Sequence, residues 1–262
     1  MLESSGGLQE AAKALNSMAI QLWRASLGSR SLNLRRAIED LEAALQVYTE
    51  QDFPQGWAMT QNNRGNAWSD MPTGNREENL RRAIECYEAA LRVYGEHEFP
   101  QYWAMTQNNL GIAWWAMPTG DRGENLRRAI ACFEAASRVY TEQDFPQYWA
   151  ITQNNLGEAW RDVPTGNRGE NLRRAIEYFE AALRVLTEQD FPQYWATTQN
   201  NLGIAWGGLP TGDRGENLRR AIACYESALR VYTEQDFPRE HKTASENLAV
   251  AREDLRRLSG QQ

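Results

Sequence analysis

The chain has 262 residues, of which 24% are charged, with a mean hydropathy of −0.69, a formal net charge of −7 and a pI of about 5.1. No stretch approaches the roughly 18 apolar residues of a membrane-spanning helix, the N-terminus lacks the pattern of a secretory signal, and an acidic surface disfavours nucleic acid. Three cysteines without a CxxC motif indicate reduced thiols, so we expect a cytoplasmic protein with no membrane or nucleic-acid partner.

An internal repeat of 46 residues runs through most of the chain. The motif Asn-Leu-Arg-Arg-Ala-Ile begins at Asn33, Asn79, Asn125, Asn171 and Asn217. All nine prolines lie either in a Phe-Pro step or in a Pro-Thr-Gly turn, and both residue types mark helix ends. The segments between them have helical periodicity and no alternating strand pattern. Each unit is therefore predicted to contain an A helix after Phe-Pro and a B helix after Pro-Thr-Gly.

In chain order, the sequence predicts a tail at 1–10, five helix pairs, a closing helix and a short tail at 259–262. The helix pairs occupy units at about 11–53, 54–99, 100–145, 146–191 and 192–237, and the closing helix spans 238–258. One pair cannot bury the apolar stripes of both its helices, whereas stacked pairs can. We therefore expect an all-α, right-handed α-solenoid of about five helix-turn-helix repeats with a C-terminal capping helix. The end helices depart from the repeat and are predicted to act as polar caps.

These residues resemble the tetratricopeptide repeat. Leu110-Gly111 and Trp114 match its A-helix signature, and Ala129 and Phe133 match its B-helix signature at the same spacing. That family's repeat has about 34 residues, and the longer unit here is similar to bacterial arrays often joined to a CHAT peptidase domain. The resemblance covers roughly residues 11–258. It implies a protein-interaction fold and transfers no catalytic residue, because no peptidase domain is present.

The candidate binding surface is the A-helix face opposite the core stripe, because in the resembled family these positions line the concave groove that holds peptides or partner helices. This face carries a constant asparagine pair and several slots that vary between units. The predicted contact residues are Asn62, Asn63, Asn66, Asn108, Asn109, Ile112, Trp115, Asn154, Asn155, Glu158, Arg161, Asn200 and Asn201. Asparagine both donates and accepts, as a peptide backbone requires. Two alternatives stay open: the asparagines stabilise helix stacking, and the variable slots reflect neutral drift.

Within this face, Trp115 is the best candidate for a binding anchor, since aromatic residues dominate interface energetics. The carboxylate clamp of some tetratricopeptide domains is not reproduced, because the only lysines, Lys13 and Lys242, lie in the end helices. Eight of the ten tryptophans are predicted to pack in the core stripe, and the repeated arginine pairs are predicted to form a solvated, salt-bridged face. The three cysteines occupy one B-helix slot and are interpreted as buried small hydrophobes.

No catalytic triad, phosphate-binding loop or metal motif occurs, so we expect no enzyme activity, no cofactor and no metal site. The leading hypothesis is a non-catalytic module that binds a peptide or partner segment. The alternatives are a structural scaffold that self-associates through its solenoid ends and a regulatory fragment of a larger CHAT-peptidase-type signalling protein. Sedimentation against concentration separates a binding module from a scaffold.

Overall fold

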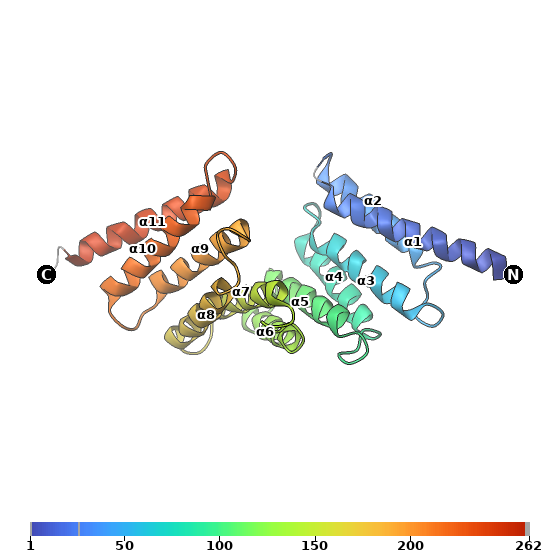
Figure 1. The fold of residues 1–262 in the computed structure, drawn as a ribbon, viewed down its shortest axis with the longest axis horizontal. Coiled ribbons are helices and arrows are strands. Elements are labelled where there is room, and N and C mark those ends of the chain that lie inside the picture. Colours follow the sequence, from blue (N-terminus) through green and yellow to red (C-terminus); the bar gives the residue numbers. More distant parts are fainter. Residues whose placement is uncertain (1, 26, 260–262) are drawn as a thin grey trace. The chain divides into compact units, whose positions relative to one another are not determined.

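The computed structural model describes residues 2–25 and 27–259, without the side chains of residues 2–5. Over this range the chain forms eleven α-helices and no strand. The A helices are α1 (Leu2–Arg24), α3 (Pro54–Ser69), α5 (Pro100–Ala116), α7 (Pro146–Asp162), α9 (Pro192–Gly208) and α11 (Pro238–Ser259). The B helices are α2 (Arg30–Ala44), α4 (Arg76–Leu91), α6 (Arg122–Ser137), α8 (Arg168–Leu183) and α10 (Arg214–Val231). The prediction of an all-α solenoid of five helix pairs and a closing helix is confirmed (Figure 1).

The helices belong to two compact units, residues 1–139 and residues 140–262. The first unit contains α1 to α6 and the second contains α7 to α11. Within each unit, an A helix packs on the B helix that follows it, and that B helix packs on the next A helix. Helices α2, α4, α8 and α10 are thus each held between two A helices, as stacking of a repeat requires.

Local sequence fixes where each helix begins. Pro100 begins α5, where its missing N–H is not needed and its fixed φ suits the first helical turn. Asp121 caps α6, since its side chain accepts a hydrogen bond from the backbone N–H of Glu124 at 3.0 Å. Gly120 in the preceding turn has φ +81°, a conformation that favours glycine. These features recur in the later units, so the same turn is built repeatedly.

The core lies between helices of successive pairs. Leu80, Ile84 and Tyr87 of α4 form one buried cluster with Leu110 and Ala113 of α5. The equivalent residues of α8 and α9 form the same cluster in the second unit. Because the apolar stripes of neighbouring helices meet, the polar faces of the B helices and the outer faces of the A helices remain for solvent or partners.

The two ends of the chain differ from the predicted tail and caps. Helix α1 begins at Leu2, so most of the segment predicted as a tail extends the first A helix instead; nothing before residue 11 contains a proline that would stop it. The tail predicted at 259–262 lies largely outside the described residues. Helix α11 has the expected polar surface, including the pair Arg257–Glu253. Helix α1 instead exposes Leu8 (56%) and Met18 (52%). Met18 occupies the slot of Leu110, which is buried against the preceding B helix α4, whereas no B helix precedes α1 in the described residues.

Candidate binding surface

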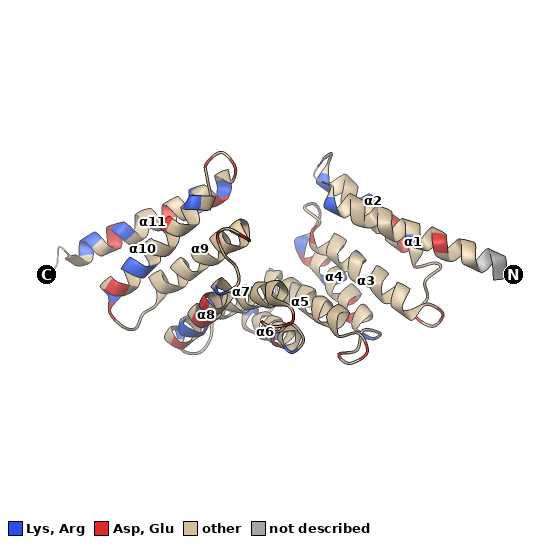
Figure 2. Ribbon diagram, viewed as in Figure 1, with Lys and Arg blue, Asp and Glu red and all other residues tan. Residues whose placement is uncertain are grey.

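Charged side chains are distributed unevenly between the two kinds of helix. Figure 2 shows them along the B helices, whereas α5 and α9 carry none and α3 carries only Arg64. Helix α7 is the exception among the central A helices, with Glu158, Arg161 and Asp162. Over the described residues, no helix combines the length and the apolar character needed to cross a lipid bilayer. Helices α3, α5 and α9 therefore present mainly amide, hydroxyl and apolar groups.

The asparagines predicted to contact a ligand join neighbouring A helices in the first unit. Asn62 is buried, and its Oδ1 lies 3.3 Å from both the Thr106 hydroxyl and Asn109 Nδ2 of the next A helix. Asn109 also donates to Asn66 Oδ1 at 3.1 Å, and that oxygen accepts from the Tyr87 hydroxyl at 2.8 Å. These bonds link α3, α4 and α5, so the asparagines there satisfy one another inside the stack.

The same arrangement recurs in the second unit. The Thr198 hydroxyl lies 3.0 Å from Asn154 Oδ1, which connects α9 to α7. Asn200 Oδ1 accepts from Asn247 Nδ2 at 3.4 Å, which connects α9 to α11. A ladder of amide and hydroxyl groups therefore follows the A helices in both units, and it fixes their register.

The remaining predicted asparagines are half-buried. Asn63 Nδ2 contacts Asn16 Oδ1 of α1 at 3.4 Å, while Asn108 and Asn155 lie half-buried on α5 and α7. The hydrogen bonds give these pairs a stacking role, which was one of the two interpretations that the sequence left open. That role accounts for two asparagines in mid-helix, where their intrinsic propensity is unfavourable.

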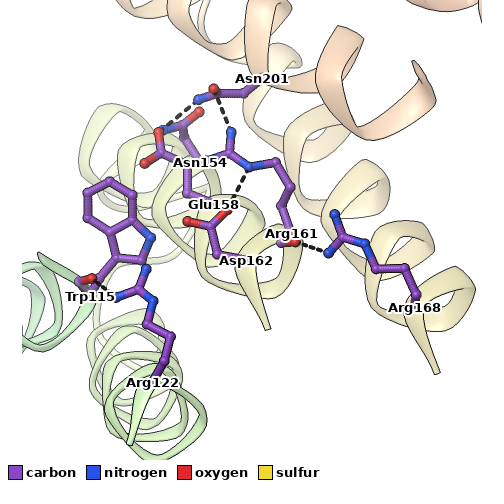
Figure 3. Close-up of polar contacts among 8 residues, drawn as sticks. All are labelled: Trp115, Arg122, Asn154, Glu158, Arg161, Asp162, Arg168 and Asn201. Atoms are coloured by element: carbon purple, nitrogen blue, oxygen red, sulfur yellow. Dashed lines mark hydrogen bonds and ion pairs between the residues drawn. The ribbon is translucent and has the colours of Figure 1, made fainter. Parts of the chain in front are cut away.

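Glu158 and Arg161 form a polar cluster rather than two separate solvent-facing charges (Figure 3). Glu158 Oε1 accepts from Asn154 Nδ2 at 3.0 Å and from Asn201 Nδ2 at 2.8 Å. Arg161 Nη1 donates to Asn201 Oδ1 at 2.8 Å, and its Nε pairs with Asp162 at 2.9 Å. Burial raises the pKa of Glu158, although Arg161 and the two amide donors oppose that shift. Since the Arg161 side chain is only 14% exposed, much of its hydrogen-bonding capacity is used inside the protein.

Ile112 and Trp115 lie on the outer side of α5. Ile112 is 37% exposed, and Trp115 is half-buried. The carbonyl oxygen of Trp115 accepts a hydrogen bond from the Arg122 guanidinium at the start of α6, which fixes the backbone at this helix end (Figure 3). A half-buried ring on a fixed backbone has little freedom to lose on binding, which suits an anchor residue.

The eight tryptophans of the two repeat slots are each covered by an arginine. In the third repeat, the Arg138 guanidinium lies 5.0 Å from the Trp103 ring and pairs with Glu96 at 2.7 Å. Arg128 lies 4.6 Å from Trp114 in the same way. Most of the predicted salt bridges along the B helices are present, including Arg128–Glu124 at 2.9 Å. The arginines that cover the tryptophans therefore have both an ionic and a cation–π partner. The hydrogen bond from Arg138 lowers the pKa of the Glu96 carboxyl.

The three thiols have the properties of packed side chains. Cys86 is buried, and Cys132 and Cys224 are half-buried. Burial raises the pKa of Cys132 and of Cys224 to about 12, so these thiols stay protonated at neutral pH. A protonated thiol is a weak nucleophile.

One feature of this surface was missed in the sequence: a pocket of about 420 Å³ between α9 and α11. Asn200 lines it together with Thr197, Tyr232 and Glu240. The sequence does contain an indication of this pocket. Position 240 is glutamate, whereas the three preceding units have tyrosine at the equivalent position.

No protein-family model matches the sequence, and no curated protein matches it.

Proposed function

We propose that the protein is a non-catalytic interaction module of the tetratricopeptide type, which binds a peptide or partner segment along the outer faces of its A helices. The observation that carries this proposal is the concentration of sequence variation on these faces, next to a nearly invariant ladder. At the slot of Ile112, the other units have Asn66, Glu158 and Ile204, while the core residues of each unit stay nearly the same. A surface that differs between otherwise similar units suits sequence-selective recognition.

The ladder and the variable slots would then have separate tasks. Within each unit, the asparagine and threonine contacts hold neighbouring A helices in one register, so the variable side chains of that unit stand at fixed spacings. Trp115 supplies an aromatic anchor, and Ile112 extends the apolar area around it. The cluster of Glu158 and Arg161 supplies a polar position, with its charges already oriented by amides. A segment bound to the first unit would bring an apolar residue to Trp115, and a segment bound to the second unit would bring polar groups to the cluster.

The test is selection of peptides from a random displayed library against the intact protein, followed by titration of the selected peptides by calorimetry. The Trp115→Ala variant should bind them more weakly, whereas Ala131→Ser, on an exposed B-helix position, should bind them unchanged. Selected peptides that bind both variants as tightly as the parent protein would show that the A-helix face is not the recognition surface.

A self-assembling scaffold is the second candidate, and the apolar side chains exposed on α1 favour it. Leu8 and Met18 are both more than half exposed on the first A helix. An assembly through this end should grow with protein concentration in sedimentation velocity, and Met18→Glu should stop the growth. A constant sedimentation coefficient over a hundred-fold range of concentration would remove this candidate. Regulation of a CHAT-type effector in the cytoplasm of a bacterium is the cellular setting we propose for the binding module.

A further inference from the structure

The pocket between α9 and α11 lies among the first turns of both helices. It is lined by Thr197, Asn200, Tyr232, Phe237, Arg239 and Glu240, among others. Its volume of about 420 Å³ falls in the range of sites that hold small molecules or single side chains. The Tyr232 hydroxyl is 2.6 Å from that of Thr197, so the ring that forms one wall is held in place.

The same position between α3 and α5 holds a tyrosine of the protein itself. Tyr102 occupies the slot of Glu240, and it stacks on Tyr94, which occupies the slot of Tyr232. The two rings have centroids 5.1 Å apart and an interplanar angle of 18°. In the second unit, Tyr148 stacks on Tyr140 at 5.1 Å and 21°. The stacked ring is therefore part of the repeat, and it recurs with nearly constant geometry.

Three substitutions open the pocket between α9 and α11. Glutamate replaces the stacking tyrosine at position 240, and threonine replaces methionine at positions 197 and 243, where the α3 and α5 slots have Met59 and Met105. Arg239 also replaces Gln101 at the rim. Tyr232 still packs on Phe237, with ring centroids 5.6 Å apart, as Tyr94 does on Phe99 at 5.8 Å. Tyr232 still lines the site with 6% of its surface exposed, and the tyrosine that the repeat normally stacks on it is absent.

We propose that this pocket binds a tyrosine side chain of the partner segment, stacked on Tyr232 in place of the missing repeat tyrosine. The inference rests on the proposed function and names the chemistry of its ligand at one position. Arg239 and Glu240 are exposed at the rim, and neither forms an ion pair with another described residue, so both are available to the polar backbone or flanking charges of the segment. Asn200 belongs both to this pocket and to the ladder, which places the tyrosine on the same A-helix face as the other predicted contacts.

The probe is the repeat's own sequence around Tyr102, N-acetyl-Pro-Gln-Tyr-amide, with N-acetyl-Pro-Gln-Ala-amide as its control. Binding is followed by ¹H–¹⁵N NMR titration of the full chain. The tyrosine peptide should cause saturable shifts at Thr197, Asn200 and Glu240, and the alanine peptide should not. Equal shifts with both peptides, or none with either, would overturn the proposal. Shifts with a phenylalanine or tryptophan peptide but not with tyrosine would overturn the choice of tyrosine.

Two variants taken from the repeat itself test the pocket. Glu240→Tyr restores the repeat residue, so it should abolish binding while leaving the thermal midpoint equal or higher. Tyr232→Leu introduces the side chain that Leu186 has in the equivalent slot, so the fold should persist while binding weakens roughly 2- to 10-fold, the range expected for loss of an aromatic pair. Undiminished binding by a folded Glu240→Tyr protein would show that the peptide binds elsewhere.

A gain of binding provides the converse test. Tyr102→Glu combined with Met59→Thr and Met105→Thr reproduces all three substitutions between α3 and α5, so it should create a second site for the tyrosine peptide, with new shifts around Tyr94. The outcomes also separate this inference from the proposed function. A partner segment that binds the parent and Glu240→Tyr equally would refute the pocket and leave the function standing. A tyrosine peptide that binds while no partner segment uses the A-helix faces would refute the function alone.

Discussion

Two glycines of α9, Gly203 and Gly207, lie one turn apart and should respond in opposite ways to alanine. A Cβ added at Gly203 would lie 2.6 Å from Cε1 of Tyr225, and 2.9 Å from Cδ1 of that ring, which is 4% exposed and packed in the core. A Cβ at Gly207 would meet its nearest atoms, on Ala221 and Tyr225, at 3.7 Å, an ordinary contact. Both substitutions remove a helical glycine, which is worth ~1 kcal/mol in each case.

The free energy of unfolding of Gly207→Ala should therefore rise by up to ~1 kcal/mol, with less expected near a helix end. Gly203→Ala has the same gain but also forces Tyr225 to move, and such overpacking costs ~1–3 kcal/mol. Because the propensity terms largely cancel, the difference between the two variants measures mainly the overpacking at Gly203. Urea denaturation followed by circular dichroism at 222 nm gives both values. Equal midpoints for the two variants would refute the close approach of α9 and α10 at Gly203.

Three further predictions follow from the surface. If a ligand is found, Trp115→Ala should weaken binding more than Arg161→Ala, because exposed or internally paired charges contribute only ~0–1 kcal/mol. Calorimetric titration of both folded variants measures the two losses of affinity. Equal losses, or a larger loss for Arg161→Ala, would contradict the prediction. Glu158→Gln should raise the urea midpoint at pH 7, because burial raises the pKa of Glu158 and the folded state therefore favours a neutral side chain. The difference between variant and parent should vanish as the pH falls below 4.5, the ordinary pKa, where the parent side chain is neutral as well. A difference that does not depend on pH would contradict the raised pKa of Glu158. Arg138→Gln should lose about 0.5–1 kcal/mol from the cation–π contact with Trp103, and an unchanged denaturation midpoint would count against that contact.

The helices were predictable because proline and glycine fix their ends and the 46-residue period repeats the information. The prediction was wrong at residues 2–10, where α1 extends through a segment with two glycines, because helix continuation is decided by neighbouring turns as well as by propensity. Periodicity also placed Glu158 and Arg161 on the outer side of α7. It did not show that Asn201, on the next A helix, bonds both side chains, because such a contact depends on the register between helices.

The pocket between α9 and α11 could be predicted only in part from the sequence. Position 240 differs from the repeat in a helix that the sequence marked only as a degenerate cap. The consequence of that difference required knowing that Tyr102 and Tyr94 are stacked, which is a three-dimensional fact. A substitution in an end repeat can therefore be a simple loss of the repeat residue, or it can expose a new surface. The packing of the neighbouring side chains distinguishes these two cases.

The central claim, that partners bind the outer faces of the A helices, is tested most directly by photo-crosslinking from matched positions on the two helices of one repeat. A photoreactive phenylalanine analogue placed at Ile112 on α5 faces the proposed binding surface, and the same analogue at Ala131 on α6 is exposed on a B helix. With a peptide selected for binding to the intact protein, we expect saturable crosslinking from position 112 only, and competition by unlabelled parent protein but not by Trp115→Ala. Equal crosslinking from both positions, or crosslinking from position 131 alone, would contradict the assignment of the binding surface.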